Sequence, residues 1–179
     1  FLQQLDPAST SYNMPLVLPL DQQVAVNTLQ RVFEKLVARH ESLRTRFVTV
    51  GSEPVQQVRD DMDFKITYLQ APAEELEACI KRCIRPFDLS SDQLLRVYVI
   101  NEGGSDAVLV IDMHHIISDG TTSVVLKEDF MSLMRGEALA ALRLQYKDYS
   151  CWQNSEAVHA LMAGQERYWK ELYSAEIPR

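Results

Sequence analysis

Several features that would reveal a protein's class at once are missing from this sequence. Only three cysteines occur in 179 residues, at positions 79, 83 and 151, and this low, odd number excludes a disulfide framework. The net charge of −7 excludes the basic surface that nucleic acid or an anionic membrane requires. No apolar run approaches membrane-spanning length, and no signal peptide opens the chain. A reduced, cytoplasmic setting is therefore expected, with no nucleic-acid or membrane partner.

The common catalytic motifs are missing as well. The sequence contains no Gly-x-Ser-x-Gly elbow, no phosphate loop and no Gly-x-Gly-x-x-Gly, so it gives no indication of a serine hydrolase, a P-loop enzyme or a dinucleotide-binding enzyme. Cys79 and Cys83 stand four residues apart in a helix-like segment, but no further ligand stands close to them. The two thiols are therefore expected in the core, and no metal site is predicted.

The composition is that of a globular domain. Hydrophobic residues make up 46% of the chain, which is enough for one domain with a core, while the length is too short for two ordinary domains. The first residue is Phe1, so we expect the chain to be a piece of a longer protein. A single domain over residues 1–179 is predicted.

The spacing of apolar residues predicts mixed helices and hairpins. Helical spacing occurs over 21–41, 73–84, 121–134, 146–162 and 166–174. Strand-like segments occur over 14–20, 43–50, 55–58, 64–69, 94–100 and 107–113. Asp21 is expected to cap the first helix, Gly164 to separate the last two, and prolines to make the first strand an edge or irregular strand. The fold class is therefore α+β, with helices packed on a mainly antiparallel sheet.

Residues 108–126 concentrate the polar side chains that could do chemistry. An apolar strand ends in His114 and His115, then Asp119 and Gly120 follow after three residues, and a helix begins just beyond. Neighbouring residues of a strand point to opposite faces, so the two histidines cannot easily share a metal ion. One histidine is expected in the interior, and the other is expected to project into a cleft beyond the strand end.

Two interpretations of these residues stay open. In the functional one, one imidazole acts as a base, or as an orienting acceptor, for an attacking nucleophile, because its ordinary pKa suits this role at neutral pH. In the structural one, the fold satisfies both histidines, and Asp119 caps the following helix or pairs with an arginine. Gly120 would allow a turn conformation and would bring no side chain into the cleft. His40 and His159 are expected to be ordinary helix-end or surface histidines.

Residues 113–120, MHHIISDG, resemble the H-H-x-x-x-D-G signature of nonribosomal peptide synthetase condensation domains. Four further segments resemble motifs of that family in the same order: RHESLRTRF at 39–47, RPFDL at 85–89 with LLR at 94–96, YKDY at 146–149 with Trp152, and YW at 168–169 with Leu172. The resemblance runs along most of the chain and implies a lobe like chloramphenicol acetyltransferase. It implies the N-terminal lobe alone, because the opening motif of the family and the C-terminal lobe are absent.

The resemblance also implies a reaction and a set of site residues. In the parent protein, an aminoacyl thioester attacks an acyl or peptidyl thioester to form an amide. Phosphopantetheine tethers both substrates to donor and acceptor peptidyl carrier proteins, and no cofactor or metal is bound directly. His115 would lie nearest the attacking amine, with His114 in support. Asp119 would be structural and paired with Arg44, and Gly120 would leave room for the amine. The parent would carry the second lobe and an adjacent adenylation domain, in antibiotic or other secondary-metabolite biosynthesis.

Two other functions stay open beside this one. The chain could be a CoA-dependent acyltransferase of the H-x-x-x-D type, although the flanking motifs argue against it. It could also be a non-catalytic lobe that docks a carrier protein. By itself the chain is expected to be inactive, because half a tunnel cannot hold both substrates or exclude water. Tyr146, Tyr149 and Trp152 share a helix face and are expected to serve packing.

Overall fold

The structure is a computed structural model that describes residues 2–20, 24–61, 63–102 and 107–174. The chain divides into two compact units, residues 1–141 and residues 142–179. The first unit contains the strands, and the second consists of two helices. The expectation of one domain over residues 1–179 stays a prediction.

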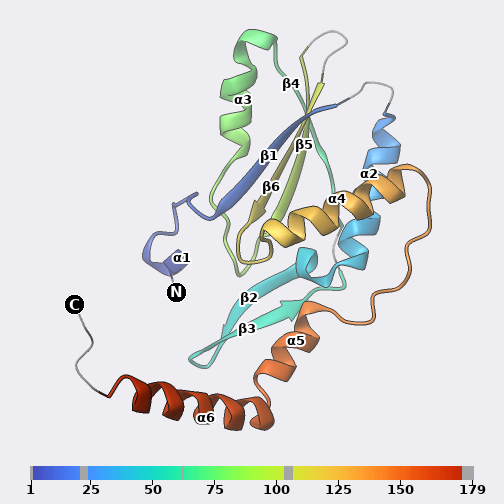
Figure 1. The fold of residues 1–179 in the computed structure, drawn as a ribbon. Coiled ribbons are helices and arrows are strands. Elements are labelled where there is room, and N and C mark those ends of the chain that lie inside the picture. The colour runs from blue at the N-terminus through green and yellow to red at the C-terminus, as the bar shows by residue number, and fades with distance from the viewer. Residues whose placement is uncertain (1, 21–23, 62, 103–106, 175–179) are drawn as a thin grey trace. The chain divides into compact units, whose positions relative to one another are not determined.

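The larger sheet of the first unit has the strand order β1-β6-β5-β4 (Figure 1). β1 (Asn13–Leu20) pairs antiparallel with β6 (Ala107–His114), which pairs antiparallel with β5 (Leu95–Asn101). β5 pairs in parallel with β4 (Thr67–Gln70). The predicted α+β class with a mainly antiparallel sheet is confirmed. Within the described residues β1 lies at the edge of this sheet, as its two prolines predicted, because proline lacks the N–H that a central strand uses.

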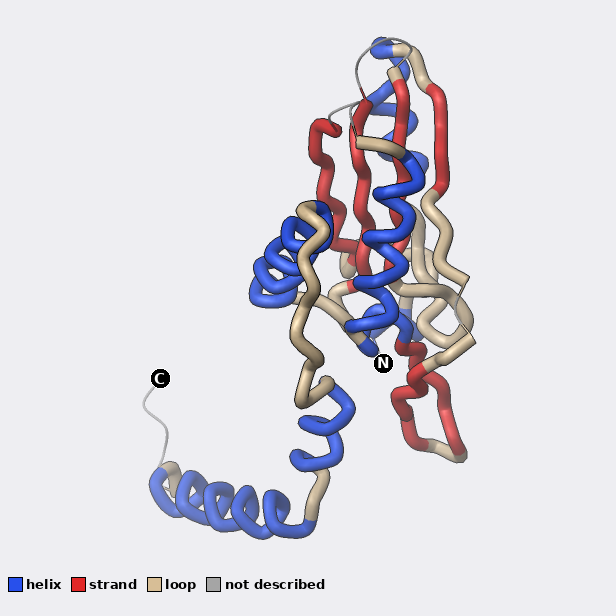
Figure 2. Tube along the Cα trace, turned by 90° about the vertical axis from the view of Figure 1, so that its right-hand side faces the viewer, coloured by secondary structure: helices blue, strands red, loops and turns tan. Residues whose placement is uncertain are grey.

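Helices cover both faces of this sheet (Figures 1 and 2). α2 (Val26–Arg39) and α4 (Gly120–Met134) lie over one face, and α3 (Leu76–Cys83) lies over the other. Alternate residues of the strands supply the two cores. The larger core includes Leu29, Phe33, Leu36, Leu95, Val97, Val99, Leu109 and Met113. The smaller core includes Cys79, Cys83, Tyr98, Ile100 and Val110, so both thiols of α3 are buried, as predicted.

A separate two-stranded sheet forms the predicted hairpin, from β2 (Thr45–Val50) and β3 (Glu53–Val58). Its turn contains Gly51 at φ +64°, a backbone conformation in which a side chain would be strained. The short helix η1 (Glu41–Arg44) joins α2 to this hairpin. Two further short helices are α1 (Leu2–Leu5) and η2 (Ala73–Glu75), which lies ahead of α3.

The starts of α2 and β4 differ from their predicted positions. α2 begins at Val26, and Asp21, its predicted cap, lies outside the described residues. β4 begins at Thr67, three residues later than predicted. The side chain of Gln30 in α2 explains the later start, because it donates to the carbonyl of Phe64 at 2.7 Å and accepts from the N–H of Ile66 at 2.9 Å. These backbone groups therefore bond to a helix side chain and not to a neighbouring strand.

The second unit contains α5 (Tyr146–Gln153) and α6 (Glu156–Leu172). The predicted break at Gly164 is wrong, because Gly164 lies inside α6. The chain breaks ahead of Ser155, whose hydroxyl accepts from the N–H of Val158 at 3.4 Å and caps α6. A glycine in a helix costs only about 1 kcal/mol relative to alanine, so it need not end one.

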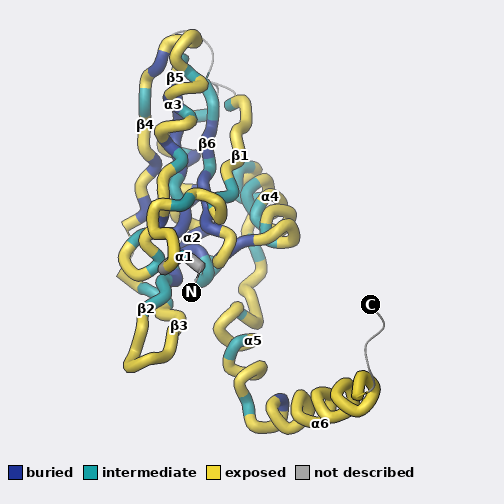
Figure 3. Tube along the Cα trace, turned by 90° about the vertical axis from the view of Figure 1, so that its left-hand side faces the viewer, coloured by how far each residue is buried: buried dark blue, intermediate teal, exposed yellow. Residues whose placement is uncertain are grey.

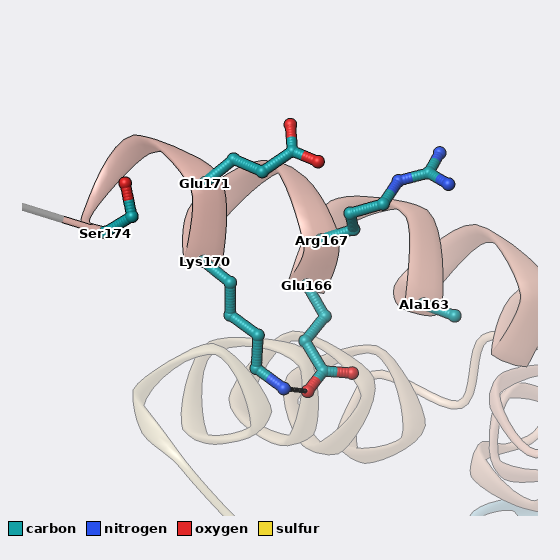
Figure 4. Close-up of a pocket in the computed structure, with 6 residues that line it drawn as sticks. All are labelled: Ala163, Glu166, Arg167, Lys170, Glu171 and Ser174. Atoms are coloured by element: carbon teal, nitrogen blue, oxygen red, sulfur yellow. Dashed lines mark ion pairs between the residues drawn. The ribbon is translucent and has the colours of Figure 1, made fainter.

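Most residues of this unit are exposed (Figure 3). Tyr146, Tyr149 and Trp152 contact one another in a row along α5, with ring centroids 5.8 and 5.7 Å apart, yet each is about half exposed. A shallow depression of about 400 Å³ lies along α6, where Lys170 forms an ion pair with Glu166 at 2.5 Å (Figure 4). Its lining residues come from one helix and the residues after it, so it is a groove between side chains and not a site.

Candidate functional site

β6 delivers the two adjacent histidines to a turn that leads into α4 (Figure 1). His114 is the last residue of the strand and is 4% exposed, whereas His115 follows it and is exposed. The His115 N–H donates to the carbonyl of Tyr12 at 2.7 Å, and the Ile117 N–H donates to the carbonyl of His114 at 3.1 Å. The structure confirms that the interior holds one histidine and leaves the other accessible.

The imidazole of His114 supports the turn from inside. Its Nδ1 accepts a hydrogen bond from the N–H of Ile116 at 3.0 Å, so Nε2 carries the proton of the neutral ring. Tyr12 and Phe87 flank the ring, each with a centroid distance of 6.0 Å. Burial lowers the pKa of His114, and the neighbouring His115 lowers it further. His114 is therefore a neutral, buried residue that holds the backbone of the turn.

A buried carboxylate lies two residues before His114, on the same face of the sheet. Asp112 is 0% exposed, and its Oδ2 accepts from Asn13 Nδ2 at 2.8 Å and lies 3.8 Å from Arg96 Nη1. Burial raises the pKa of Asp112 to about 6, against the opposing effect of the Asn13 hydrogen bond and the nearby arginines. The Arg96 guanidinium lies 3.8 Å over the ring of Phe87. Sequence reasoning missed Asp112, although an ionisable residue inside an apolar strand was the available signal.

The carboxylate of Asp119 caps α4. Its Oδ1 accepts from the N–H of Thr122 at 2.7 Å and from the Thr122 hydroxyl at 2.8 Å. These two hydrogen bonds lower the pKa of Asp119. Of the two predicted roles, capping is confirmed. Gly120 is the first residue of α4 and does not have a positive φ, so the turn conformation proposed for it is wrong.

The predicted pairing of Arg44 with Asp119 is wrong. Arg44 Nη1 donates to the carbonyl of Arg59 at 2.7 Å and to Asp60 Oδ1 at 2.6 Å, and its Nη2 lies 3.6 Å from Glu41 Oε1. Arg44 ends η1, so its guanidinium reaches the end of the β2–β3 hairpin. Asp119 is satisfied by the first turn of its own helix, and it does not need an arginine.

A second carboxylate that sequence reasoning missed is Asp129 in α4. Its Oδ2 lies 2.7 Å from His40 Nε2 and 2.8 Å from Arg39 Nε, at the C-terminal end of α2. His40 was predicted to be an ordinary helix-end or surface histidine, but its side chain is only 12% exposed and contacts this carboxylate. His159 is exposed, as predicted. No sequence spacing could identify Asp129, because its partners lie 89 and 90 residues away.

An apolar cavity of about 640 Å³ lies between the sheet and α4. It extends to the region of the motif, because Met113 precedes His114 directly and Ser123 lies in the first turns of α4. Its lining also includes Met14, Leu16, Leu18, Phe33, Leu36, Leu43, Leu95, Leu109, Ile111, Val124, Leu126, Lys127, Phe130 and Met131. In the part of the chain that the structure describes, no group of three or more potential metal ligands comes together, and no helix is long and apolar enough to cross a membrane.

Several solved structures share this fold. The X-domain from teicoplanin biosynthesis aligns with a TM-score of 0.73 and 26% identity, over 87% of this chain and 35% of that one. The starter condensation domain of the rhizomide synthetase RzmA aligns with a TM-score of 0.76 over 95% of this chain and 44% of that one. At 17% identity, this second similarity shows the fold alone.

Comparison of sequences identifies the family. Surfactin synthase subunit 1 of Bacillus subtilis (strain 168) is 42% identical over 177 residues, which are 99% of this chain and 5% of that protein. Bacitracin synthase 2 of Bacillus licheniformis is 37% identical over 177 residues, which are 99% of this chain and 7% of that protein. The chain thus spans a small part of each relative. A profile of the family described as Condensation domain matches residues 1–179, and the chain belongs to that family.

Proposed function

We propose that this chain is the N-terminal lobe of a nonribosomal peptide synthetase condensation domain, and that it supplies one wall of the site at which an amide bond forms. Its relatives include synthases of surfactin and bacitracin. It spans 35% and 44% of two solved structures of this fold, as one lobe of a two-lobed domain would. The second lobe and an adenylation domain would belong to the parent protein.

The accessibility of His115 is the observation that carries this proposal. The fold buries His114, and the carboxylate of Asp119 is exposed but bonded to Thr122 of its own helix, so His115 is the exposed histidine of the motif. In the proposed reaction, the amine of an aminoacyl thioester attacks the carbonyl of an acyl or peptidyl thioester. A C–N bond forms, the C–S bond breaks, and the sulfur leaves as a phosphopantetheine thiol. His115 orients the amine or accepts its proton.

The environment of Gly120 is a second observation that supports the same proposal. A Cβ built at this position meets no heavy atom within 4 Å, so neither packing nor backbone conformation within the described residues requires a glycine there. The space in front of the turn is then available to the substrate amine. Thioester aminolysis is intrinsically easy, and holding two tethered substrates together can supply most of the acceleration.

Donor and acceptor carrier proteins are the proposed partners, because both substrates would arrive on phosphopantetheine arms. No cofactor or metal takes part in this proposed reaction. By itself the chain should form no peptide from two loaded carrier proteins, because one wall of a tunnel cannot hold both arms.

The proposal is tested by the substitution His115→Ala in the complete condensation domain. Peptide formation from two loaded carrier proteins should fall by about a hundredfold or more, which is the usual contribution of a positioned general base. His159→Ala, which removes an exposed histidine of α6, is the matched control and should leave the rate unchanged. Near-wild-type activity of the His115 variant would exclude the assigned role, whereas acyl transfer from CoA but not from a carrier protein would indicate an acyltransferase.

A further inference from the structure

α4 is joined to α2 by one compact polar cluster. Asp129 Oδ2 contacts both Arg39 Nε at 2.8 Å and His40 Nε2 at 2.7 Å, and Arg39 Nη1 also donates to the carbonyl of Ala140 at 2.5 Å. The three side chains are 19%, 12% and 14% exposed for Arg39, His40 and Asp129. Because water reaches them poorly, these charge-assisted hydrogen bonds are stronger than those of an exposed pair.

The first half of α4 has little other support. No residue of α4 is buried, and the side chains that pack against the larger core are mainly in its second half: Leu126, Phe130, Leu133 and Met134. The apolar cavity of about 640 Å³ lies between α4 and the sheet, and its lining includes Ser123 and Val124 near the start of the helix as well as Phe130 and Met131 further along it. Asp119 bonds to Thr122 of the same helix, so the cap stabilises α4 without tying it to the sheet.

We propose that Asp129 is a positioning residue for His115, in that its contacts to Arg39 and His40 set where the first turn of α4 lies. A helix is stiff over ten residues, which span about 15 Å, so a shift at Asp129 reaches Asp119 and the turn before it. The same turn holds His115. The functional part of this inference rests on the role proposed for His115, whereas its structural part does not.

The structural part is tested by hydrogen–deuterium exchange on the chain itself. Asp129→Ala should speed exchange of the amides of residues 117–125 by about tenfold, the factor expected from losing a hydrogen bond made to a charged group. Glu128→Ala, at the exposed neighbouring position of the same helix, is the matched control and should leave exchange unchanged, and the amides of β5 should stay protected in both variants. Unchanged exchange over 117–125 in folded Asp129→Ala would overturn the proposal.

A second pair of variants guards against a variant that does not fold. His40→Gln keeps an N–H donor that can reach Asp129 Oδ2, whereas His40→Ala does not. His40→Gln should keep exchange over 117–125 near that of the wild type, and His40→Ala should raise it. Equal behaviour of the two variants would show that the contact with Asp129 is irrelevant to the position of α4, and would overturn the proposal.

The functional part is tested by kinetics of the complete condensation domain. Asp129→Ala should lower kcat by about tenfold with little change in KM for the acceptor, because misplacing a reacting group slows the chemical step more than binding. In a His115→Ala background the same substitution should have little further effect. If Asp129→Ala lowers kcat equally in both backgrounds, it does not act through His115. If His115→Ala alone leaves activity intact, the proposed function fails while the exchange experiment still tests the position of α4.

Discussion

The buried carboxylate of Asp112 should make the stability of this chain depend on pH in an unusual direction. Burial raises its pKa from the ordinary 3.8 to about 6, so the folded chain binds this proton more tightly than the unfolded chain does. The contribution of Asp112 to the free energy of unfolding is most favourable at low pH, where the side chain is protonated in both the folded and the unfolded chain. This contribution is lost as the pH rises through about 6. A tenfold change in a proton-binding constant corresponds to about 1.4 kcal/mol. The rise of the Asp112 pKa from 3.8 to about 6 therefore corresponds to a loss of about 3 kcal/mol from the free energy of unfolding above pH 7.

The substitution Asp112→Asn isolates this effect. Asparagine keeps the size of the side chain and an oxygen that can accept from Asn13 Nδ2, but it does not ionise. In urea unfolding, the variant should be more stable than the wild type by about 1 kcal/mol at pH 4.5 and by about 3 kcal/mol at pH 7.5. Comparing the two proteins at each pH cancels the titrations that they share.

The control is Asp92→Asn, because Asp92 is the other carboxylate that contacts Arg96, at 2.8 Å, and it is 38% exposed. Its substitution removes a partly exposed carboxylate from the same guanidinium, so it separates the loss of an Arg96 contact from the effect of burying a carboxylate. A difference between Asp112→Asn and wild type that stays constant from pH 4.5 to 7.5 would refute the reasoning. So would a variant that is less stable than the wild type at pH 7.5, since the Arg96 contact would then outweigh the cost of burial.

Two further predictions concern the ends of the motif. Because burial lowers the pKa of His114, its contribution to the stability of the fold should be lost as the pH falls below 6.5. His114→Asn keeps an acceptor for the Ile116 N–H and should remove this part of the pH dependence in urea unfolding. A wild-type-like pH dependence in the variant would contradict the assignment. Asp119→Asn should preserve the cap of α4, whereas Asp119→Ala should speed hydrogen exchange of the Thr122 amide. Equal exchange of this amide in the Asn and Ala variants would show that the carboxylate does not cap the helix in solution.

The sequence by itself determined the features that depend on near neighbours. Apolar residues at i, i+3 and i+4 spacing predicted α2, and alternation around Gly51 predicted the hairpin, because both periodicities follow from backbone geometry. Pro15 and Pro19 predicted an edge strand for the same local reason. The motif at 113–120, with the other family segments, identified the family that the comparison later showed. Even here a local signal failed once, since Gly164 lies inside α6 and Ser155 marks its start.

Only the tertiary structure decided which polar groups meet. Asp112 binds Asn13 across 99 positions of the chain, and Asp129 binds His40 across 89. Arg44 binds Asp60 and leaves Asp119 to its own helix. A periodic pattern shows which face of an element a residue occupies, but it does not show which other element packs against that face. A buried charge needs a partner wherever the fold provides one, so these pairings arise only when the sheet and its helices have assembled.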